Sequence, residues 1–376
     1  MRSSERLRDA RLLVGVTQEE LALSSGVSQA TISMIERGER SFSDDNIASF
    51  ASSLALPVEF FEVPTSSIPD SAIDFRKLKS ASVKDTNRAK VLFKEAHRAA
   101  TTLMEAATYP VATVPFEQER DYPLSTSQIE EIATETRKQL QIDTGAPITN
   151  VIRALERRGV AVTPLIVPNA EEDVTASVQH FGASHWAGID AHAVVGYFPG
   201  SSGDRDRFTM SHELGHLVLH TFRQHVPSDV RETEANAFAS AFLFPLDRAA
   251  EALGSHTKLK NLAELKAQWG ISMQAIIMRA KRAELITDSH ATSLFKQISA
   301  RGWRKAEPVH VPHETPVLIR ALIEKHFGAN PFSSARIEKE LALPAVIIRS
   351  FAPGLSLTET SQTRNNVVHG RFGQNR

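Results

Sequence analysis

Two histidines and a glutamate form the most chemically suggestive pattern in this 376-residue sequence. In the stretch HELGH, residues 212–216, the histidines are four positions apart, so on a helix both imidazoles lie on one face and can reach one metal ion. Glu213 stands where a carboxylate can take a proton from a water at that metal. The alternative interpretation is a helix whose polar residues merely border a core, and a third ligand would decide between the two.

The next expected helix, residues 231–245, supplies candidates for this third ligand. Glu232 and Asn236 share a face with the small residues Ala235 and Ala239, which would let the helix approach its neighbour closely. Gly215 offers a matching flat spot in the first helix, despite the cost of about 1 kcal/mol of a mid-helix glycine. Two helices pressed together in this way would present His212, His216 and a glutamate to one ion.

These two segments resemble the ImmA/IrrE family of zinc metallopeptidases, within the wider zincin group. The resemblance covers roughly residues 125–285 and is carried by RFTMSHELGHLVLH (207–220), ETEANAFA (232–239) and LFP (243–245). It implies zinc as the cofactor, His212, His216 and a glutamate of the second helix as metal ligands, and Glu213 as the general base of an endopeptidase.

The zincin pattern Glu-x-x-Ala-Asn points to Glu232 as the third ligand and to Asn236 as the residue that orients a ligating histidine. Glu234 is rotated about 200° away on the same helix, which favours a surface or ion-pair role. His220 is interpreted as a packing histidine, and His185 and His192 as structural or substrate-edge residues. Tyr197 is the one suggestion for the group that stabilises the oxyanion, and no motif supports it.

The N-terminal 60 residues have a different pattern, that of short helices with sharp turns between them. Residues 17–20 form a predicted capping box, Gly26 ends the helix that follows, and Ser28 is a favourable N-cap for the next helix, which stops at Gly38. Asp44 or Asp45 is expected to cap a fourth helix. Two capped helices joined by a tight turn predict a helix-turn-helix.

The stretch TQEELALSSGVSQATISMIERGER, residues 17–40, resembles the DNA-binding domain of the phage-repressor (XRE/Cro) type over roughly residues 5–62. The helix from Ser28 would present exposed polar side chains to base edges, and the preceding helix would contact a phosphate. The expected DNA contacts are Ser28, Gln29, Thr31 and Ser33 for bases and Gln18 for phosphate, with an operator as the partner. A homodimer is possible, because repressor-type domains commonly bind palindromes as dimers. The alternative is a small helical bundle with ordinary polar surface residues.

The charge distribution fits this DNA-binding prediction poorly. The net charge of the chain is -1, and residues 1–42 hold six arginines against six acidic residues. Residues 75–98 are basic, with eight Lys or Arg against two acids. That segment either contacts phosphates or is a solvated helical linker.

The absence of cysteine excludes disulfides, thiolate metal sites and thiol nucleophiles, so any metal must be bound by His, Asp or Glu. No signal peptide or run of about 18 apolar residues occurs, which predicts a cytoplasmic protein without a membrane partner.

The remaining patterns predict an α+β, mainly α, fold. Residues 126–158 are helical in pattern, and 160–167, 185–190 and 193–198 are expected strands, followed by a loop over 199–207. Residues 259–287 again have the pattern of two helices joined by a glycine-containing turn. We interpret them as a subdomain that packs on the peptidase domain and not as a second DNA-binding element. The expected domains are a helix-turn-helix domain (1–65), a basic helical linker (66–121), a zincin-like peptidase domain with a small sheet and trailing helices (122–288), and a C-terminal helical region with a polar tail (289–376).

Together these patterns predict a DNA-binding regulatory zinc metalloprotease that acts under stress. In the family it resembles, the substrate is typically a repressor or antitoxin-like protein, so cleavage would switch transcription. The alternative is a DNA-binding regulator or antitoxin whose peptidase-like zinc domain senses or docks and does not cleave. A housekeeping peptidase with an accessory domain is a third interpretation.

Overall fold

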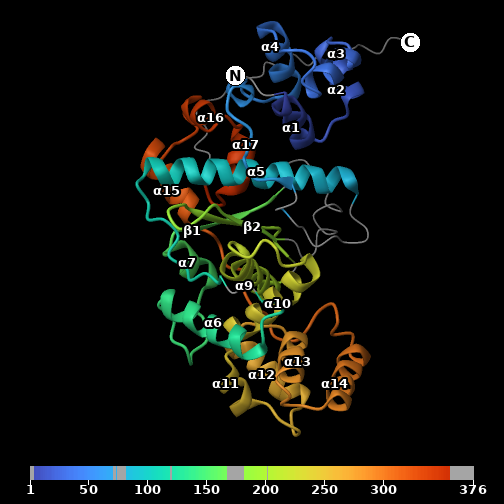
Figure 1. The fold of residues 1–376 in the computed structure, drawn as a ribbon, viewed down its shortest axis with the longest axis vertical. Helices are drawn as coiled ribbons and strands as arrows, with labels where there is room; N and C mark the ends of the chain where they lie inside the picture. The colour runs from blue at the N-terminus through green and yellow to red at the C-terminus, as the bar shows by residue number, and fades with distance from the viewer. Residues whose placement is uncertain are drawn as a thin grey trace, which may run out of the picture.

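The computed structural model describes residues 4–70, 73, 82–118, 121–166, 182–200 and 202–355. Within these ranges the chain is mainly helical with one small three-stranded sheet, as the α+β prediction requires. Figure 1 shows an elongated molecule, with the N-terminal helices at one end, the sheet in the middle and the helices of residues 246–300 at the other end. No helix in the described part of the chain is long and apolar enough to cross a membrane.

The N-terminal bundle has the helices that its capping signals predict. It consists of α1 (Glu5–Val14), α2 (Gln18–Ser25), α3 (Gln29–Glu36), α4 (Asp44–Leu54) and the 3-10 turn η1 (Val58–Phe61). Thr17 and Glu20 form the expected capping box, and Gly26 ends α2 in the left-handed conformation at φ 71°. The cap of α4 is Ser43 and not either of the aspartates that follow it, because the Ser43 hydroxyl accepts the N–H of Asn46.

A long helix, α5 (Val83–Ala106), crosses the molecule between the N-terminal bundle and the sheet (Figure 1). It packs against α1 on one side and against the sheet on the other. Its buried residues are Ala89, Val91, Leu92, Phe93, Glu95, Ala96, Ala99, Ala100, Leu103 and Met104. The segment expected to be a basic helical linker, residues 66–121, therefore contains a core helix, and a solvated linker does not describe it.

The sheet consists of β1 (Val160–Pro164), β2 (Gly182–Trp186) and β3 (Ala193–Tyr197) in the order β1-β3-β2. β3 pairs in parallel with β1 and in antiparallel with β2. The strands expected over 160–167 and 193–198 are present but shorter, as β1 and β3. Their valine residues favour strand structure. The strand expected over 185–190 lies three residues earlier, because residues 187–192 leave the sheet in a turn closed by the Ala191 N–H and the Gly188 carbonyl.

Two helices lie against the face of the sheet opposite α5, α7 (Val151–Glu156) and α9 (Gly203–His220). α10 (Ser228–Leu243) packs on α9, and α6 (Thr126–Gln139) packs on α10. The helical pattern over 126–158 thus divides into two helices. The expected loop over 199–207 was wrong in its second half, since α9 already begins at residue 203. Arg207 lies inside α9, ion-pairs with Glu314 and donates to the carbonyl of Ile148 at 2.7 Å, so tertiary contacts stabilise this first part of the helix.

The remaining helices form two groups that lie far apart in Figure 1. α11 (Leu246–Ala252), α12 (Leu259–Trp269), α13 (Met273–Arg282) and α14 (Asp288–Ala300) form a subdomain in which α13 contacts α10. The chain then returns to the other end, where α15 (Leu318–Phe327), α16 (Arg336–Leu341) and α17 (Ala345–Phe351) lie beside α5 and β1. Most of the expected polar tail, residues 356–376, lies outside the described residues.

The sheet separates two hydrophobic cores. Along β1, Val160 and Val162 face one core and Ala161 faces the other, as the two-residue period of a strand requires. One core joins the sheet to α6, α7, α9, α10 and the subdomain of α11–α14. The other core is shared by the N-terminal bundle, α5 and α15–α17. The N-terminal bundle is therefore packed into the body of the protein.

A buried ion pair joins the N-terminal bundle to α5. Arg6 of α1 is fully buried and pairs with Glu95 of α5, and its guanidinium lies 3.7 Å from the centroid of the Phe60 ring. Glu95 also accepts two hydrogen bonds from Arg98, at 2.9 and 2.8 Å. Burial alone would raise the pKa of the Glu95 carboxyl, but the two guanidinium groups lower it below its usual value.

The substitution Glu95→Gln should destabilise the fold by about 3–5 kcal/mol, because it leaves two guanidinium groups without their buried counter-charge. A lower denaturation midpoint in urea, followed by circular dichroism, would show this. The exposed Glu105→Gln on the same helix serves as the control and should change little. The folded-state pKa of Glu95 is depressed, so the stability that it contributes is present above pH 4.5 and is lost as the pH falls below that value. An equal response of the two variants would contradict this assignment.

Candidate functional site

The site begins with a close contact between α9 and α10, which pack against each other along their small residues. A Cβ atom added at Gly215 would lie 3.0 Å from the Phe238 ring and 3.2 Å from the Cα of Ala235. A larger residue there would require the Phe238 ring and the α10 backbone at Ala235 to shift by a few tenths of an ångström. The expected flat spot is therefore present, and it brings Glu232, one turn before Ala235, against the histidines of α9.

The side chains of His212, His216 and Glu232 converge on one point. The Nε2 atoms of the two histidines are 3.0 Å apart, and the Glu232 carboxylate oxygens lie 3.5 Å from His212 Nε2 and 3.2 Å from His216 Nε2. Ligands held at 2.0–2.1 Å by a tetrahedral zinc ion lie roughly 3.3 Å from one another, so the three atoms have the spacing of a metal site. Among the described residues, no other three His, Asp or Glu side chains converge in this way.

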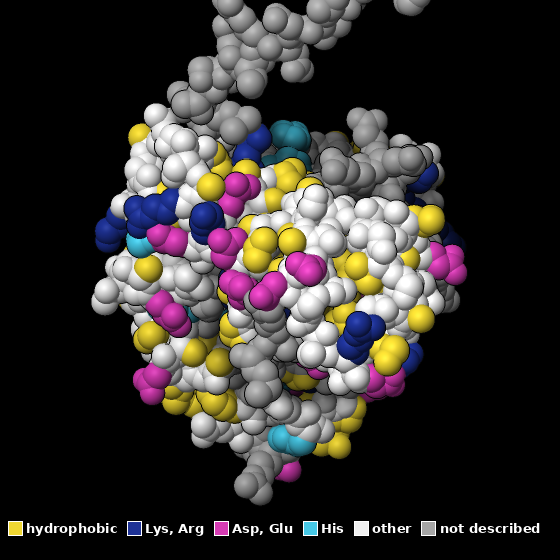
Figure 2. Space-filling model, turned by 90° about the horizontal axis from the view of Figure 1, so that it is seen from above, with side chains coloured by type: hydrophobic (Ala, Val, Ile, Leu, Met, Phe, Trp, Pro, Cys, Tyr) yellow, Lys and Arg dark blue, Asp and Glu magenta, His cyan; other side chains and the backbone are white. Residues whose placement is uncertain are grey.

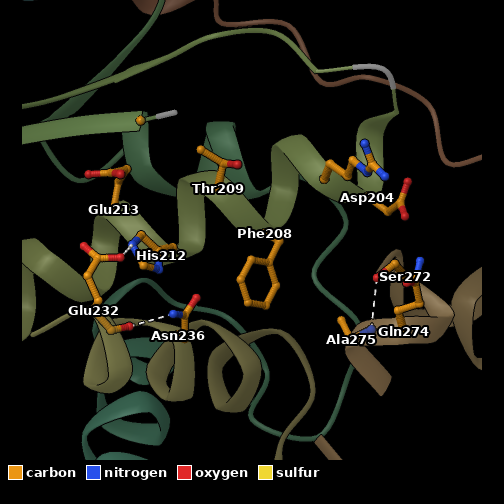
Figure 3. A pocket seen from close by; sticks show the side chains of 12 residues that line it. Asp204, Phe208, Thr209, His212, Glu213, Glu232, Asn236, Ser272, Gln274 and Ala275 are labelled. Atoms are coloured by element: carbon orange, nitrogen blue, oxygen red, sulfur yellow. Dashed lines mark hydrogen bonds and ion pairs between the residues drawn. The ribbon is translucent and has the colours of Figure 1, made fainter. Parts of the chain in front are cut away.

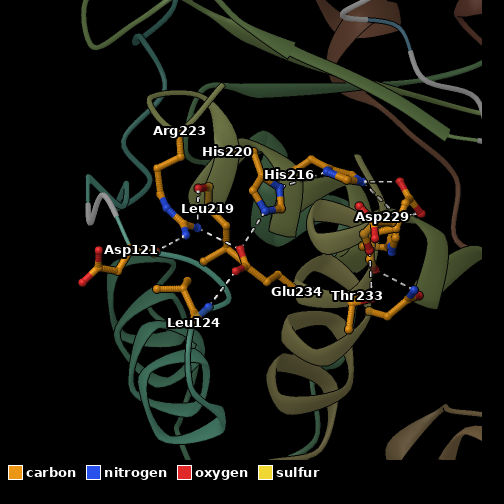
Figure 4. A network of polar contacts seen from close by, with 12 residues as sticks. Asp121, Leu124, His216, Leu219, His220, Arg223, Asp229, Thr233 and Glu234 are labelled. Atoms are coloured by element: carbon orange, nitrogen blue, oxygen red, sulfur yellow. Dashed lines mark hydrogen bonds and ion pairs between the residues drawn. The ribbon is translucent and has the colours of Figure 1, made fainter. Parts of the chain in front are cut away.

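Glu234 lies away from these three side chains, and Figure 4 shows it on the other side of α10, between Arg223 and His220. It is buried and accepts hydrogen bonds from Arg223 Nη1 at 2.8 Å and from the backbone N–H of Leu124 at 2.7 Å. Burial alone would raise the pKa of its carboxyl, but the hydrogen bonds from His220 and Arg223 outweigh burial and lower the pKa to about 2. Glu234 is thus an ion-pair residue, as one expectation held, and not a surface residue.

His220 is buried behind His216, with the Nδ1 atoms of the two rings 3.0 Å apart. Its Nε2 lies 3.1 Å from Glu234 Oε2. Burial lowers the pKa of His220 to about 4, although the bond to Glu234 opposes this shift. The expected packing histidine therefore contacts a candidate metal ligand, which the sequence pattern did not indicate.

Glu213 lies beside the three converging side chains on the side of β2. Its Oε2 accepts a hydrogen bond from the Ser184 hydroxyl at 2.8 Å. A Cβ atom at Gly182 would lie 2.5 Å from the Glu213 Cγ, so the carboxylate occupies space that only a glycine leaves open. Neither Gly182 nor Ser184 was among the predicted site residues, and the only sequence signal was a glycine close to an expected strand.

Two cavities flank the site and meet at Glu213 and Glu232, which line both. The first, of about 260 Å³, runs along α9 from His212 to Asp204 and the start of α13. Figure 3 shows Glu213, His212 and Glu232 at one end of this cavity and Asp204, Ser272 and Gln274 at the other. The second, of about 340 Å³, is lined by Ser184, His185, Trp186, His216, Arg231 and Pro69, among others. The site is therefore open on two sides.

The other residues predicted for the peptidase site divide into two that line the cavities and two that are buried away from them. Asn236 lines the first cavity, but its amide donates to the Glu232 backbone carbonyl at 2.7 Å, and this bond to the backbone differs from the expected contact with a histidine. Tyr197 is buried in the core, where burial raises the pKa of its hydroxyl, and it lines neither cavity, so the oxyanion suggestion gains no support. His185 lines the second cavity, whereas His192 is buried.

The predicted DNA contacts lie on α2 and α3. Gln29 donates to the Gln18 side-chain carbonyl at 2.8 Å, and Gln18 donates to Glu36 at 2.9 Å, so the two glutamines hold each other in place.

The hydroxyl residues predicted to contact DNA take part in local hydrogen bonds. Ser28 caps α3 through the Thr31 N–H, and the hydroxyls of these two residues lie 3.0 Å apart. The Ser33 hydroxyl accepts from Arg37 at 2.6 Å. Gln29 is exposed, while Thr31 is half-buried.

Among the described residues, two arginines near this surface are paired with glutamates, and the exposed Arg40 donates to the Thr31 hydroxyl at 3.4 Å. Arg11 is bound to Glu36 and Arg37 to Glu39. In the basic segment 75–98, four side chains donate hydrogen bonds to other groups of the chain: Arg88, Lys90, Lys94 and Arg98. Lys84 is exposed, and the segment's other basic residues lie outside the described residues. Figure 2, a view onto the bundle end, accordingly shows acidic and basic side chains interspersed on that face.

Two glutamates of α10 provide a test of the metal site. Glu232→Gln should remove the anionic ligand, so the purified protein should lose most of its bound zinc. Glu234→Gln should still bind about one equivalent at saturating zinc, because Glu234 lies behind the ligands. Equilibrium dialysis against a buffer with saturating zinc, followed by metal analysis of both compartments, measures both. If Glu234→Gln lost its zinc while Glu232→Gln kept it, our ligand assignment would be wrong.

The Gln18 and Gln29 pair generates a prediction for DNA. Gln29→Ala should reduce the preference for operator over unrelated DNA, with a loss of about 1–3 kcal/mol for each base contact removed. Gel-shift titrations of both DNAs at one salt concentration measure the ratio. Ser52→Ala, an exposed change on α4, is the control. An unaltered operator preference in Gln29→Ala would assign base recognition to other residues.

Comparison with known proteins finds two family models that match separate regions of the chain. Residues 7–61 match the family model of the helix-turn-helix, and residues 170–281 match that of the IrrE N-terminal-like domain, a peptidase family. A comparison with curated proteins finds no match. The first region contains α2 and α3, and the second contains both helices of the converging histidines and glutamate. The chain thus joins an XRE-type helix-turn-helix region to an IrrE/ImmA-like peptidase domain.

Proposed function

We propose that this protein is a DNA-binding regulator that also acts as a zinc-dependent endopeptidase and switches transcription by cleaving another regulator. The observation that carries the proposal is the convergence of His212, His216 and Glu232 between two cavities, with Glu213 beside them. A purely structural metal site is normally closed by a fourth protein ligand. Here three ligands are found among the described residues, and the space beside them is open.

The donor set favours zinc. Two imidazoles and one carboxylate, without thiolates, match the ligands of catalytic zinc sites in peptidases. When bound, zinc would polarise the carbonyl of a peptide bond and lower the pKa of a water molecule. The protein's own contribution is to hold the three ligands at the spacing described above and to leave one side open to the substrate.

Glu213 is suited to the proton transfers of peptide hydrolysis. Its carboxylate takes a proton from the attacking water and then delivers that proton to the nitrogen of the leaving amine. Ser184 donates to one carboxylate oxygen, which orients the group. Gly182 leaves the space that the side chain occupies. A base fixed in this way loses little conformational freedom when the substrate binds.

A positively charged side chain, that of Arg231, also lines the second cavity. His216 and Glu232 line the same cavity. A guanidinium in that position can donate to the carbonyl oxygen on which negative charge develops. We assign it this role in place of Tyr197.

The two cavities favour an internal cleavage site, since an extended substrate can continue on both sides of the reacting bond. The resemblance to ImmA/IrrE peptidases suggests a repressor or antitoxin-like substrate. The DNA-binding bundle suggests that the reaction takes place near DNA. We further propose that it takes place in the cytoplasm and in response to stress. The alternative function is a regulator whose zinc domain senses or docks without cleaving.

The substitution Glu213→Gln separates these two functions. It should preserve zinc content and DNA binding, because Glu213 is not a ligand, and lower peptide hydrolysis about 10²- to 10⁴-fold. Transcripts of the regulated genes should then stay uninduced under the inducing stress, compared with cells that carry wild-type protein at equal abundance. A normal transcriptional response in the variant would favour the sensing or docking function.

A second variant, Gly182→Ala, tests the position of the Glu213 carboxylate without changing Glu213 itself. Gly182→Ala places a Cβ atom in the space of the Glu213 carboxylate and should displace it. We expect full zinc content and an activity loss approaching that of Glu213→Gln. The control is Ala183→Gly, which changes the adjacent strand residue without crowding Glu213. Wild-type activity in Gly182→Ala would show that the exact position of Glu213 matters little.

A further inference from the structure

Behind the proposed metal site, a chain of hydrogen bonds runs from His216 through His220 and Glu234 to Arg223 (Figure 4). We propose that His220, Glu234 and Arg223 are positioning residues that fix the tautomer of His216, so that its Nε2 lone pair is directed at the metal. The proposal rests on the metal site proposed above and extends it to residues that do not touch the metal.

The donors and acceptors of this chain can be assigned from its outer end. The Glu234 carboxylate accepts the N–H of Leu124 at Oε1 and the Arg223 guanidinium at Oε2. An ionised carboxylate can only accept hydrogen bonds. The contact of 3.1 Å between Glu234 Oε2 and His220 Nε2 therefore requires a proton on His220 Nε2.

The tautomer of His220 then determines that of His216, because their Nδ1 atoms are in contact. A neutral imidazole carries one N–H, so protonation of His220 at Nε2 leaves its Nδ1 as an acceptor. The Nδ1 of His216 lies 3.0 Å from it and must be the donor. With its proton on Nδ1, His216 has a free lone pair on Nε2, the atom that lies near His212 and Glu232. The opposite tautomer would place a proton where the metal binds.

The outer end of the chain is rigid. Arg223 is fully buried, and it donates to the backbone carbonyls of Asp121 at 2.9 Å and Leu219 at 3.3 Å. His220 is also buried, and the neighbouring guanidinium disfavours a second positive charge on its ring. The segment before α6 thus contributes the Asp121 carbonyl and the Leu124 N–H, which bind Arg223 and Glu234. Through Glu234 and His220, these contacts orient the ring of His216. Hydrogen-bonded partners of metal-ligating histidines typically contribute roughly 10- to 100-fold in metal affinity.

Nitrogen-15 NMR of the histidine rings tests the tautomers directly, in both the metal-free and the zinc-loaded protein. We expect protons on His216 Nδ1 and His220 Nε2 in both forms. In the metal-free protein the Glu232 carboxylate, 3.2 Å from His216 Nε2, favours a proton on that atom, so this form tests whether the chain of hydrogen bonds outweighs it. A proton on His216 Nε2 in the metal-free protein would overturn the proposal. This measurement does not depend on catalysis or on metal binding.

Zinc affinity, measured by competition with a chelator, tests the energetic contribution. His220→Phe keeps a ring but removes both nitrogens, and it should weaken zinc binding roughly 10- to 100-fold. His220→Asn should recover part of the affinity, because its side-chain oxygen can replace Nδ1 as the acceptor. Glu234→Gln should fall between wild type and His220→Phe. Unchanged affinity in His220→Phe would overturn the proposal.

The matched control is Glu130→Gln, which neutralises a carboxylate paired with the buried Arg279 in the same half of the molecule. It should lower stability without changing zinc affinity. If Glu130→Gln and His220→Phe weakened zinc binding equally, the effect would be general destabilisation, and the proposal would fail. If wild-type protein bound no zinc, the proposed metal site would fail, while the tautomer measurement on the metal-free protein would still decide the role of the chain.

Discussion

The site depends on the close approach of α9 and α10 at Gly215 and Ala235. The atoms of the three candidate ligands are 3.0 to 3.5 Å apart, so a helix displaced by the width of one methyl group would separate them. α6 supports α10 from its other side. Two glutamates only two residues apart then have separate tasks, since Glu232 faces the histidines and Glu234 binds Arg223. The same rigid helix pair thus provides the ligands and their support.

α5 connects the two halves of the molecule. Its residues pack on α1 through the buried pair of Arg6 and Glu95, and on the sheet through Phe93, which lies against Gly196. Its His97 ring is 5.1 Å from that of His185, a residue that lines the second cavity. The helix-turn-helix region is therefore in continuous side-chain contact with the wall of the cleft. Such packing provides a physical route by which a shift of the bundle would reach the peptidase domain.

The helix-turn-helix surface is polar and has little net charge. Arg11 and Arg37 pair with neighbouring glutamates, and Lys90 and Lys94 of α5 bind Asp70. Nonspecific attraction to phosphate should therefore contribute little, and recognition should depend on exposed polar groups such as Gln29.

The sequence by itself determined those features that depend on local interactions. The helices of the N-terminal bundle follow from caps and glycines within a few residues, and the four-residue spacing places both histidines on one face of α9. The motif Glu-x-x-Ala-Asn already pointed to Glu232, but only the tertiary structure brought Glu232 beside the histidines and Glu234 beside Arg223, because the packing of α10 on Gly215 sets the rotation of that helix. The tertiary structure also revealed Gly182, Ser184 and the bond between His216 and His220. These contacts join residues distant in the chain, or turn a ring in a way that residue spacing cannot specify.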